Sequence, residues 1–220
     1  MRRANVGSPL NIISRREWGV LAFVLAYSFI PSIGGLLRVI ELGGGPGMIP
    51  ENPRALASPV PIVLHAVSSL IFCSVGVIQF LPSLRGRFPA LHRAGGRVIA
   101  LSGVVSALTG LWMTHFFSFP SELQGALLYW TRMFLGALMV GLIVWSVAAI
   151  RARNIGAHSA AMLRAYAIGQ GASTQTFLGI AWMVSLGTEP LGAERDVMMI
   201  FAWFINLLIA ELVIRTMFSP

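Results

Sequence analysis

The sequence predicts an all-α integral membrane protein, a six-transmembrane-helix bundle with both termini in the cytoplasm. Hydrophobic residues make up 56% of the chain and charged residues only 11%, and the mean hydropathy is +0.77. A soluble domain carries about 25% charged residues. Apolar runs of around 20 residues, the length that crosses a bilayer, occur six times. Arginines gather in alternate loops. We therefore expect one multi-pass domain over residues 1–220, in a bacterial inner membrane.

The predicted helices follow from these runs and their flanking residues. They span Trp18–Val39, Pro59–Leu81, Arg97–Phe117, Leu127–Ile150, Ala160–Leu186 and Val197–Met217. A charged segment precedes the first run, which is too long for a cleaved signal peptide, so we expect an uncleaved signal anchor. Pro59 and Pro61 suit the first turn of the second helix. The turn GRFPALHR is short, so the second and third helices should be antiparallel neighbours.

The third helix carries a face of glycines. Gly96, Gly103 and Gly110 recur every seven residues. At about 100° per residue they fall within roughly 20° of one direction. His92 shares that face if the helix begins there. The pattern predicts a smooth groove with a histidine at its mouth and an arginine cluster beside it.

The last three helices add anchors and polar residues. Tyr129 and Trp130 indicate an interfacial anchor at the start of the fourth helix. The fifth is the most polar, with Gln170, Ser173, Thr174, Gln175 and Thr176. These residues favour interhelical hydrogen bonding over a quinone or ion path. We also expect Arg164 to turn inward and bond Glu211 of the sixth helix or an anionic ligand group. A pair between Glu211 and Arg215 is the alternative.

Arginine placement sets the predicted orientation. The arginines assigned to the cytoplasmic side are Arg2, Arg3, Arg15, Arg16, Arg85, Arg87, Arg93, Arg97, Arg151, Arg153, Arg164 and Arg215. The opposite loops hold Arg54, Arg132 and Arg195 together with most of the acids. This is the positive-inside pattern. The net charge of +8 is thus expected to serve orientation and contact with anionic lipid headgroups, not nucleic acid.

Histidines are the candidate cofactor ligands. His65 and His115 fall in the outer leaflet, whereas His92 and His158 begin the third and fifth helices at the cytoplasmic boundary. Facing imidazoles with arginines near the propionates are what a b-type haem requires. The candidate cofactor-binding residues are His92, His158, Arg93, Arg97, Arg164 and His65, with His92 and His158 as ligands of the haem iron. The alternatives are structural histidines, another metal, or a proton relay.

The chain resembles a known family in two blocks. The first is LHAVSSLIFCSVGVIQFLPSLRGRFPALHRAGGRV and the second is HSAAMLRAYA. They resemble the bacterial membrane proteins grouped as domain of unknown function 2306, over about residues 60–180. The matching positions are His65, Gln79, Phe80, His92, Arg93, Gly96, Arg97, His158, Met162, Arg164 and Tyr166. Ile99 and Gln175 depart from the pattern, and His115 lies outside it. The resemblance implies a fold and no established activity.

Two functions are therefore expected, from different classes. The first is a haem-b-binding electron-transfer protein that uses the boundary histidines. The alternative is a non-catalytic accessory or assembly subunit of a larger respiratory or photosynthetic membrane complex, since no complete catalytic constellation is visible. Cys73 is the single cysteine, which excludes disulfide and iron–sulfur chemistry within the chain. A transporter is disfavoured because no helix is visibly broken and no inverted repeat is found.

Overall fold

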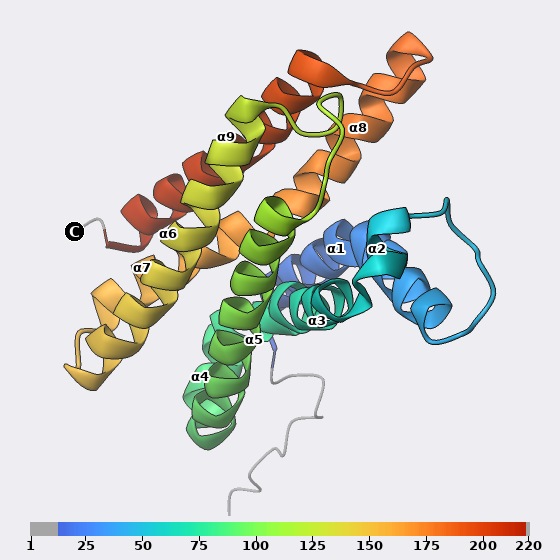
Figure 1. Ribbon diagram of the computed structural model, residues 1–220. Coiled ribbons are helices and arrows are strands. Elements are labelled where there is room, and N and C mark those ends of the chain that lie inside the picture. The colour runs from blue at the N-terminus through green and yellow to red at the C-terminus, as the bar shows by residue number, and fades with distance from the viewer. Residues whose placement is uncertain (1–12, 219–220) are drawn as a thin grey trace, which may run out of the picture.

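The computed structural model describes residues 13–218, and all regular structure in that range is helical (Figure 1). The elements are α1 (Arg15–Leu42), α2 (Pro53–Ala57), α3 (Pro59–Leu70), the π-helix η2 (Ile71–Val75), the 3-10 helix η3 (Gly76–Phe80), α4 (Pro82–Arg87), α5 (Pro89–Phe116), α6 (Ala126–Arg151), α7 (Ile155–Gly169), α8 (Gly171–Leu186) and α9 (Gly192–Phe218). Arg2 and Arg3 of the predicted cytoplasmic set lie outside the described residues, as do the two chain ends.

Five segments in the described part of the chain are long and apolar enough to cross a membrane. They are Arg15–Leu42, Pro59–Phe80, Pro89–Phe116, Ala126–Arg151 and Gly192–Thr216. Large apolar side chains cover their outer surfaces: Phe23 is 68% exposed, Trp130 67% and Leu101 66%. Such a surface is stable only against lipid. These five segments match five of the six predicted spans; four of them begin earlier than predicted, and Pro59–Phe80 begins at the predicted residue.

The fifth predicted span, Ala160–Leu186, is wrong as a single helix. It is divided at Gln170 into α7 and α8, each of which is shorter than a bilayer-crossing helix. Gly169 and Gly171 flank the break. Glycine disfavours the helix interior because of its backbone freedom. The expectation that no helix is broken was therefore wrong. One of the two arguments against a transporter no longer applies.

The freed backbone at this break is bonded by side chains of other elements. The carbonyl of Ala167 accepts from Nδ2 of Asn206 (3.2 Å), and that of Ile168 accepts from Nε1 of Trp203 (3.1 Å). The carbonyl of Gly169 accepts from Sγ of Cys73 (3.4 Å). Non-helical backbone is tolerated at membrane depth only when its polar groups are satisfied by the protein. The tertiary structure therefore supports the interruption.

A second irregular segment, η2–η3, lies against the first. The carbonyl of Cys73 in η2 accepts from Nε2 of Gln170 (3.1 Å) and from the Tyr166 hydroxyl. Gln170 also exchanges hydrogen bonds with Ser28 of α1 and accepts one from Ser173 (2.9 Å). These buried polar groups join α1, η2, α7 and α8. The interhelical role expected for the polar fifth helix is thus confirmed at Gln170. It is also confirmed at Thr174, which donates to Asn206 of α9 (2.7 Å), and at Gln175, which donates to the Met199 carbonyl of α9 (3.2 Å).

The core lies where α5, α6 and α7 meet η2. The Phe72 ring is fully buried. A Cβ placed on Gly103 of α5 would come within 2.6 Å of that ring, and one on Gly169 within 2.8 Å. Gly110 likewise faces His65, and Gly96 faces Gln79. The glycine face predicted on α5 is present, but side chains of α3, η2 and η3 fill it, as in close packing of membrane helices.

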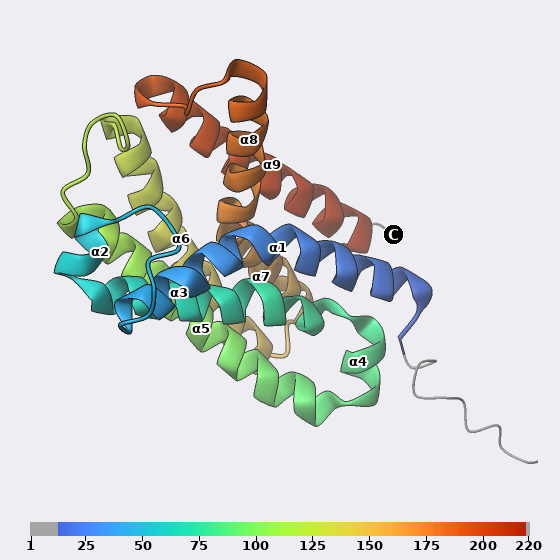
Figure 2. The same ribbon diagram turned by 90° about the vertical axis from the view of Figure 1, so that its right-hand side faces the viewer.

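Figure 2 shows how the ends of the helices are arranged. The start of α1, helix α4 and the C-terminal end of α9 lie on one side of the molecule, and α2 lies on the opposite side. Arg15, Arg16, Arg85 and Arg87 belong to the first group. We call this the arginine-rich end.

Candidate functional site

His92 and His158 come together at the arginine-rich end. α5 begins at Pro89, eight residues earlier than predicted, so His92 lies in its first turn. Asn154 caps α7 by accepting from the backbone N of Ala157 (3.0 Å), which places His158 in the first turn of that helix. The two imidazoles are close enough for their charges to interact, and His92 also feels the charges of Arg85 and Arg93. Two histidines that are 66 residues apart in the sequence thus lie at the same end of the molecule.

Ser146 of α6 fixes the orientation of His158. Its hydroxyl is 2.7 Å from Nδ1 of His158 and donates to the His158 carbonyl (3.2 Å). Nδ1 also lies 3.2 Å from the Ser146 carbonyl, which can only accept, so this ring nitrogen carries the hydrogen. Nε2 then carries the lone pair, which is the arrangement found in oriented metal-ligating histidines. The His92 ring makes no hydrogen bond within residues 13–218 and is half-buried.

Gln79 of η3 lies near the same cluster. It contacts α5 about one helical turn further along that helix than His92. A Cβ on Gly95 would come within 2.7 Å of its Nε2, and one on Gly96 within 3.5 Å of its Oε1. That Oε1 is buried and has no hydrogen-bond partner among the described residues. An unpaired buried acceptor costs free energy and calls for an explanation. The sequence placed Gln79 in the family pattern but assigned it no role.

The arginines of the predicted site divide into two groups. Arg93 and Arg97 are exposed at the start of α5. Arg164 is held by Glu211 of α9: its Nε donates to one carboxylate oxygen and its NH2 to the other at 2.8 Å. The predicted Arg164–Glu211 pair is confirmed, and its side chains are 35% and 41% exposed. Arg164 therefore fixes α7 against α9, and two of its donor nitrogens are already bonded to the Glu211 carboxylate.

His65 and His115 have separate partners. Nδ1 of His65 lies 2.9 Å from the carbonyl of Ser106, a pure acceptor, so this ring nitrogen donates across the α3–α5 interface. Nδ1 of His115 lies 2.9 Å from the Tyr129 hydroxyl on α6. His65 therefore has a packing role between two helices and is not part of the His92/His158 cluster. No group of three or more His, Cys, Asp or Glu that could hold a metal ion is found within residues 13–218.

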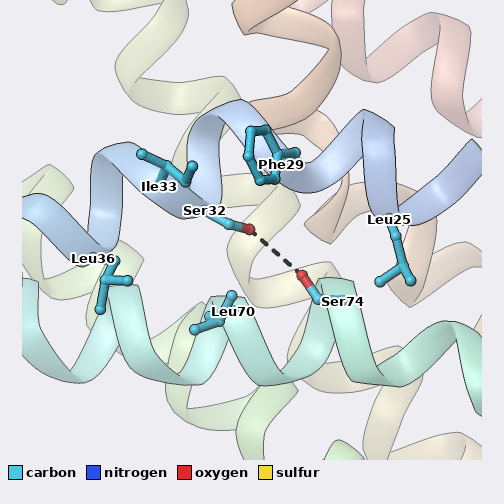
Figure 3. Close-up of a pocket in the computed structure, with 7 residues that line it drawn as sticks. All are labelled: Leu25, Phe29, Ser32, Ile33, Leu36, Leu70 and Ser74. Atoms are coloured by element: carbon cyan, nitrogen blue, oxygen red, sulfur yellow. Dashed lines mark hydrogen bonds between the residues drawn. The ribbon is translucent and has the colours of Figure 1, made fainter. Parts of the chain in front are cut away.

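One groove of about 250 Å³ opens between α1 and the α3–η2 segment (Figure 3). Its walls are apolar apart from two serines, Ser32 and Ser74, whose hydroxyls are 3.5 Å apart. The lining residues are Leu25, Phe29, Ser32, Ile33, Leu36, Leu70 and Ser74. No histidine or arginine lines it, so it is separate from the histidine cluster.

These features define a multi-pass α-helical membrane protein with interrupted helices and a polar cluster at its arginine-rich end. The chain belongs to the family described as "Predicted membrane protein (DUF2306)", whose model matches residues 62–214. The match confirms the resemblance and extends it from about residue 180 into α9. No curated protein and no solved structure shows significant similarity to the chain.

Proposed function

We propose that the protein binds haem b at the arginine-rich end and transfers electrons within the membrane. The observation that carries this proposal is that His92 and His158 each lie in the first turn of a helix at this end, with Nδ1 of His158 bonded at Ser146. His92 and His158 would hold the haem iron, for which neutral imidazoles are suitable ligands. Haem supplies reversible one-electron chemistry at its iron when it is bound.

The surrounding residues suit such a group at the boundary. Arg93 and Arg97 are exposed beside His92 and would meet the propionates. The unpaired Oε1 of Gln79 offers an acceptor at the inner edge of the cluster. Since side chains fill the glycine face of α5, the group would occupy the helix ends and not the length of that face. Arg164 would position α7, and hence His158, through Glu211.

The test is the absorption spectrum of protein purified from haem-replete cells. We expect a Soret band that is lost in His92→Ala and in His158→Ala. His115→Ala is the matched control, because His115 is exposed and bonded to Tyr129; its band should equal that of the wild type. Elution volume in gel filtration checks that each variant is folded. A colourless wild-type protein, or a band that survives both substitutions, would contradict the proposal.

The second candidate function is an accessory or assembly subunit of a larger membrane complex. The apolar groove between α1 and the α3–η2 segment favours it, because a partner helix or a lipid chain would fill such a surface. The same purification in mild detergent distinguishes the two candidates. Migration on native gels with a larger complex supports the accessory function. A lone small species under every growth condition counts against it.

We also propose that α7 and α8 together cross the membrane as a sixth, interrupted span, which puts both termini in the cytoplasm of a bacterial cell. The concentration of arginine at one end supports this orientation. Cysteines placed at Ser121 and Ala152 test it, since both sites are exposed and the native Cys73 is buried. In intact spheroplasts an impermeant maleimide should label Ser121→Cys and leave Ala152→Cys unlabelled until the membrane is opened. The reverse pattern would overturn the orientation.

A further inference from the structure

Three arginines in the described part of the chain lie away from the arginine-rich end and have no carboxylate partner. Arg54 is in α2, Arg132 is in the second turn of α6, and Arg195 is in the first turn of α9. The ion pairs within residues 13–218 join Arg38 to Glu41 and Arg164 to Glu211. A guanidinium is always charged and needs several acceptors. Half-buried guanidinium groups that form no ion pair have N–H groups left to donate to a bound anion.

A single aromatic ring brings two of these arginines together. Phe119 lies in the loop between α5 and α6. The guanidinium carbon of Arg54 is 4.8 Å from the centre of this ring, and that of Arg132 is 5.7 Å from it. Stacking on an aromatic ring orients the planar guanidinium and leaves its in-plane N–H groups free to donate. The guanidinium groups of α2 and α6 thus lie against the same ring.

Most of those N–H groups have no strong acceptor. Nε of Arg54 is buried and makes no hydrogen bond to any described residue. Arg132 donates from NH1 to Oε1 of Gln124 (2.5 Å) and from NH2 to the sulfur of Met199 (3.6 Å). A thioether is a weak acceptor. Orphaned donors in a partly buried site cost free energy unless a ligand satisfies them.

The carboxylate whose charge reaches Arg132 is already bonded to the backbone. Asp196 is buried and accepts from the backbone N of Gly125 (3.1 Å) and of Leu128 (3.3 Å), so it caps the start of α6. Its charge reaches Arg132, but so does the repelling charge of Arg195. Asp196 is therefore not bonded to either guanidinium group.

We propose that Arg54 and Arg132 bind a phosphate group at this site. Phosphate presents oxygens on several sides, so it accepts from two guanidinium groups that approach from different helices. The group is either free phosphate or the phosphate of an anionic lipid headgroup, since the site lies at the helix ends where headgroups gather. It is separate from the histidine cluster.

The two sources are distinguished by thermal unfolding of the full chain. In a neutral detergent, inorganic phosphate is titrated against chloride of equal ionic strength, and the saturable rise in Tm gives a Kd. In a second arm, the protein is melted in nanodiscs of phosphatidylcholine with and without phosphatidylglycerol. A phosphate-specific rise supports the free ion. A rise only with phosphatidylglycerol supports the lipid headgroup.

Three variants test whether the rise in Tm, with phosphate or with phosphatidylglycerol, comes from binding at Arg54 and Arg132. Arg54→Gln and Arg132→Gln should each weaken the response about tenfold, the size expected for one lost charge-assisted contact. Arg54 lies on the short α2, so its variant tests the site if Arg132→Gln fails to fold. Arg87→Gln is the matched control, because Arg87 also stacks on a ring, that of Phe88, but at the arginine-rich end. In the inorganic-phosphate arm its response should equal that of the wild type. No rise in either arm, or an equal rise in all variants, would overturn the proposal.

Discussion

Gly171→Ala is expected to lower the free energy of unfolding by on the order of 3 kcal/mol. A Cβ at this position would lie 2.0 Å from Nε1 of Trp203 and 2.5 Å from its Cδ1. The indole would have to move, and its hydrogen bond to the carbonyl of Ile168 (3.1 Å) would be lost. That carbonyl lies at the end of α7 and would be left unsatisfied inside the protein.

Gly179→Ala provides a matched control for this substitution. Gly179 is in the same helix, α8, and no atom lies within 4 Å of the added methyl group. Since alanine is the better helix former by up to about 1 kcal/mol, Gly179→Ala should leave the protein equally stable or slightly more stable. Melting curves in one detergent compare the two variants. Equal Tm values would show that α8 and α9 do not approach each other as closely at Gly171 as the structure indicates.

Phe72→Ala is expected to destabilise the protein by about 3–5 kcal/mol, the usual cost of removing a buried phenylalanine. The ring is fully buried and fills the space above Gly103 and Gly169. Its removal would leave a cavity where α5 and α7 meet η2. Phe23→Ala removes the same atoms from a side chain that is 68% exposed. In detergent this control should change the Tm little.

A second substitution tests the same contact from the other side. A methyl group on Gly103 would lie 2.6 Å from Phe72 and 2.8 Å from Ile143, so Gly103→Ala alone should also destabilise the protein. When Gly103→Ala is combined with Phe72→Ala, the phenyl ring no longer blocks the methyl group. The double variant should therefore lose less free energy of unfolding than the two single variants lose together. If the two losses of stability were strictly additive, the close contact between Phe72 and Gly103 would be contradicted.

The sequence by itself determined the membrane class, five of the spans and the Arg164–Glu211 pair. Hydropathy averages over a window, so it reports which segments face lipid whatever their neighbours are. An arginine and a glutamate at similar depth also have few other partners in a membrane. The pair between Arg164 and Glu211 was therefore predictable from the sequence. The predicted topology also placed His92 and His158 at the same membrane boundary, and this placement suggested them as a pair.

Only the tertiary structure decided where the helices break and what fills the glycine face. The break at Gln170 lies inside an apolar run that hydropathy treats as continuous. It persists because Cys73, Trp203 and Asn206, from other parts of the chain, supply hydrogen bonds to its carbonyls. Likewise, the stacking of Arg54 and Arg132 on Phe119 joins three separate elements. Periodicity along one helix carries no information about such partners, because they are set by how helices pack against one another.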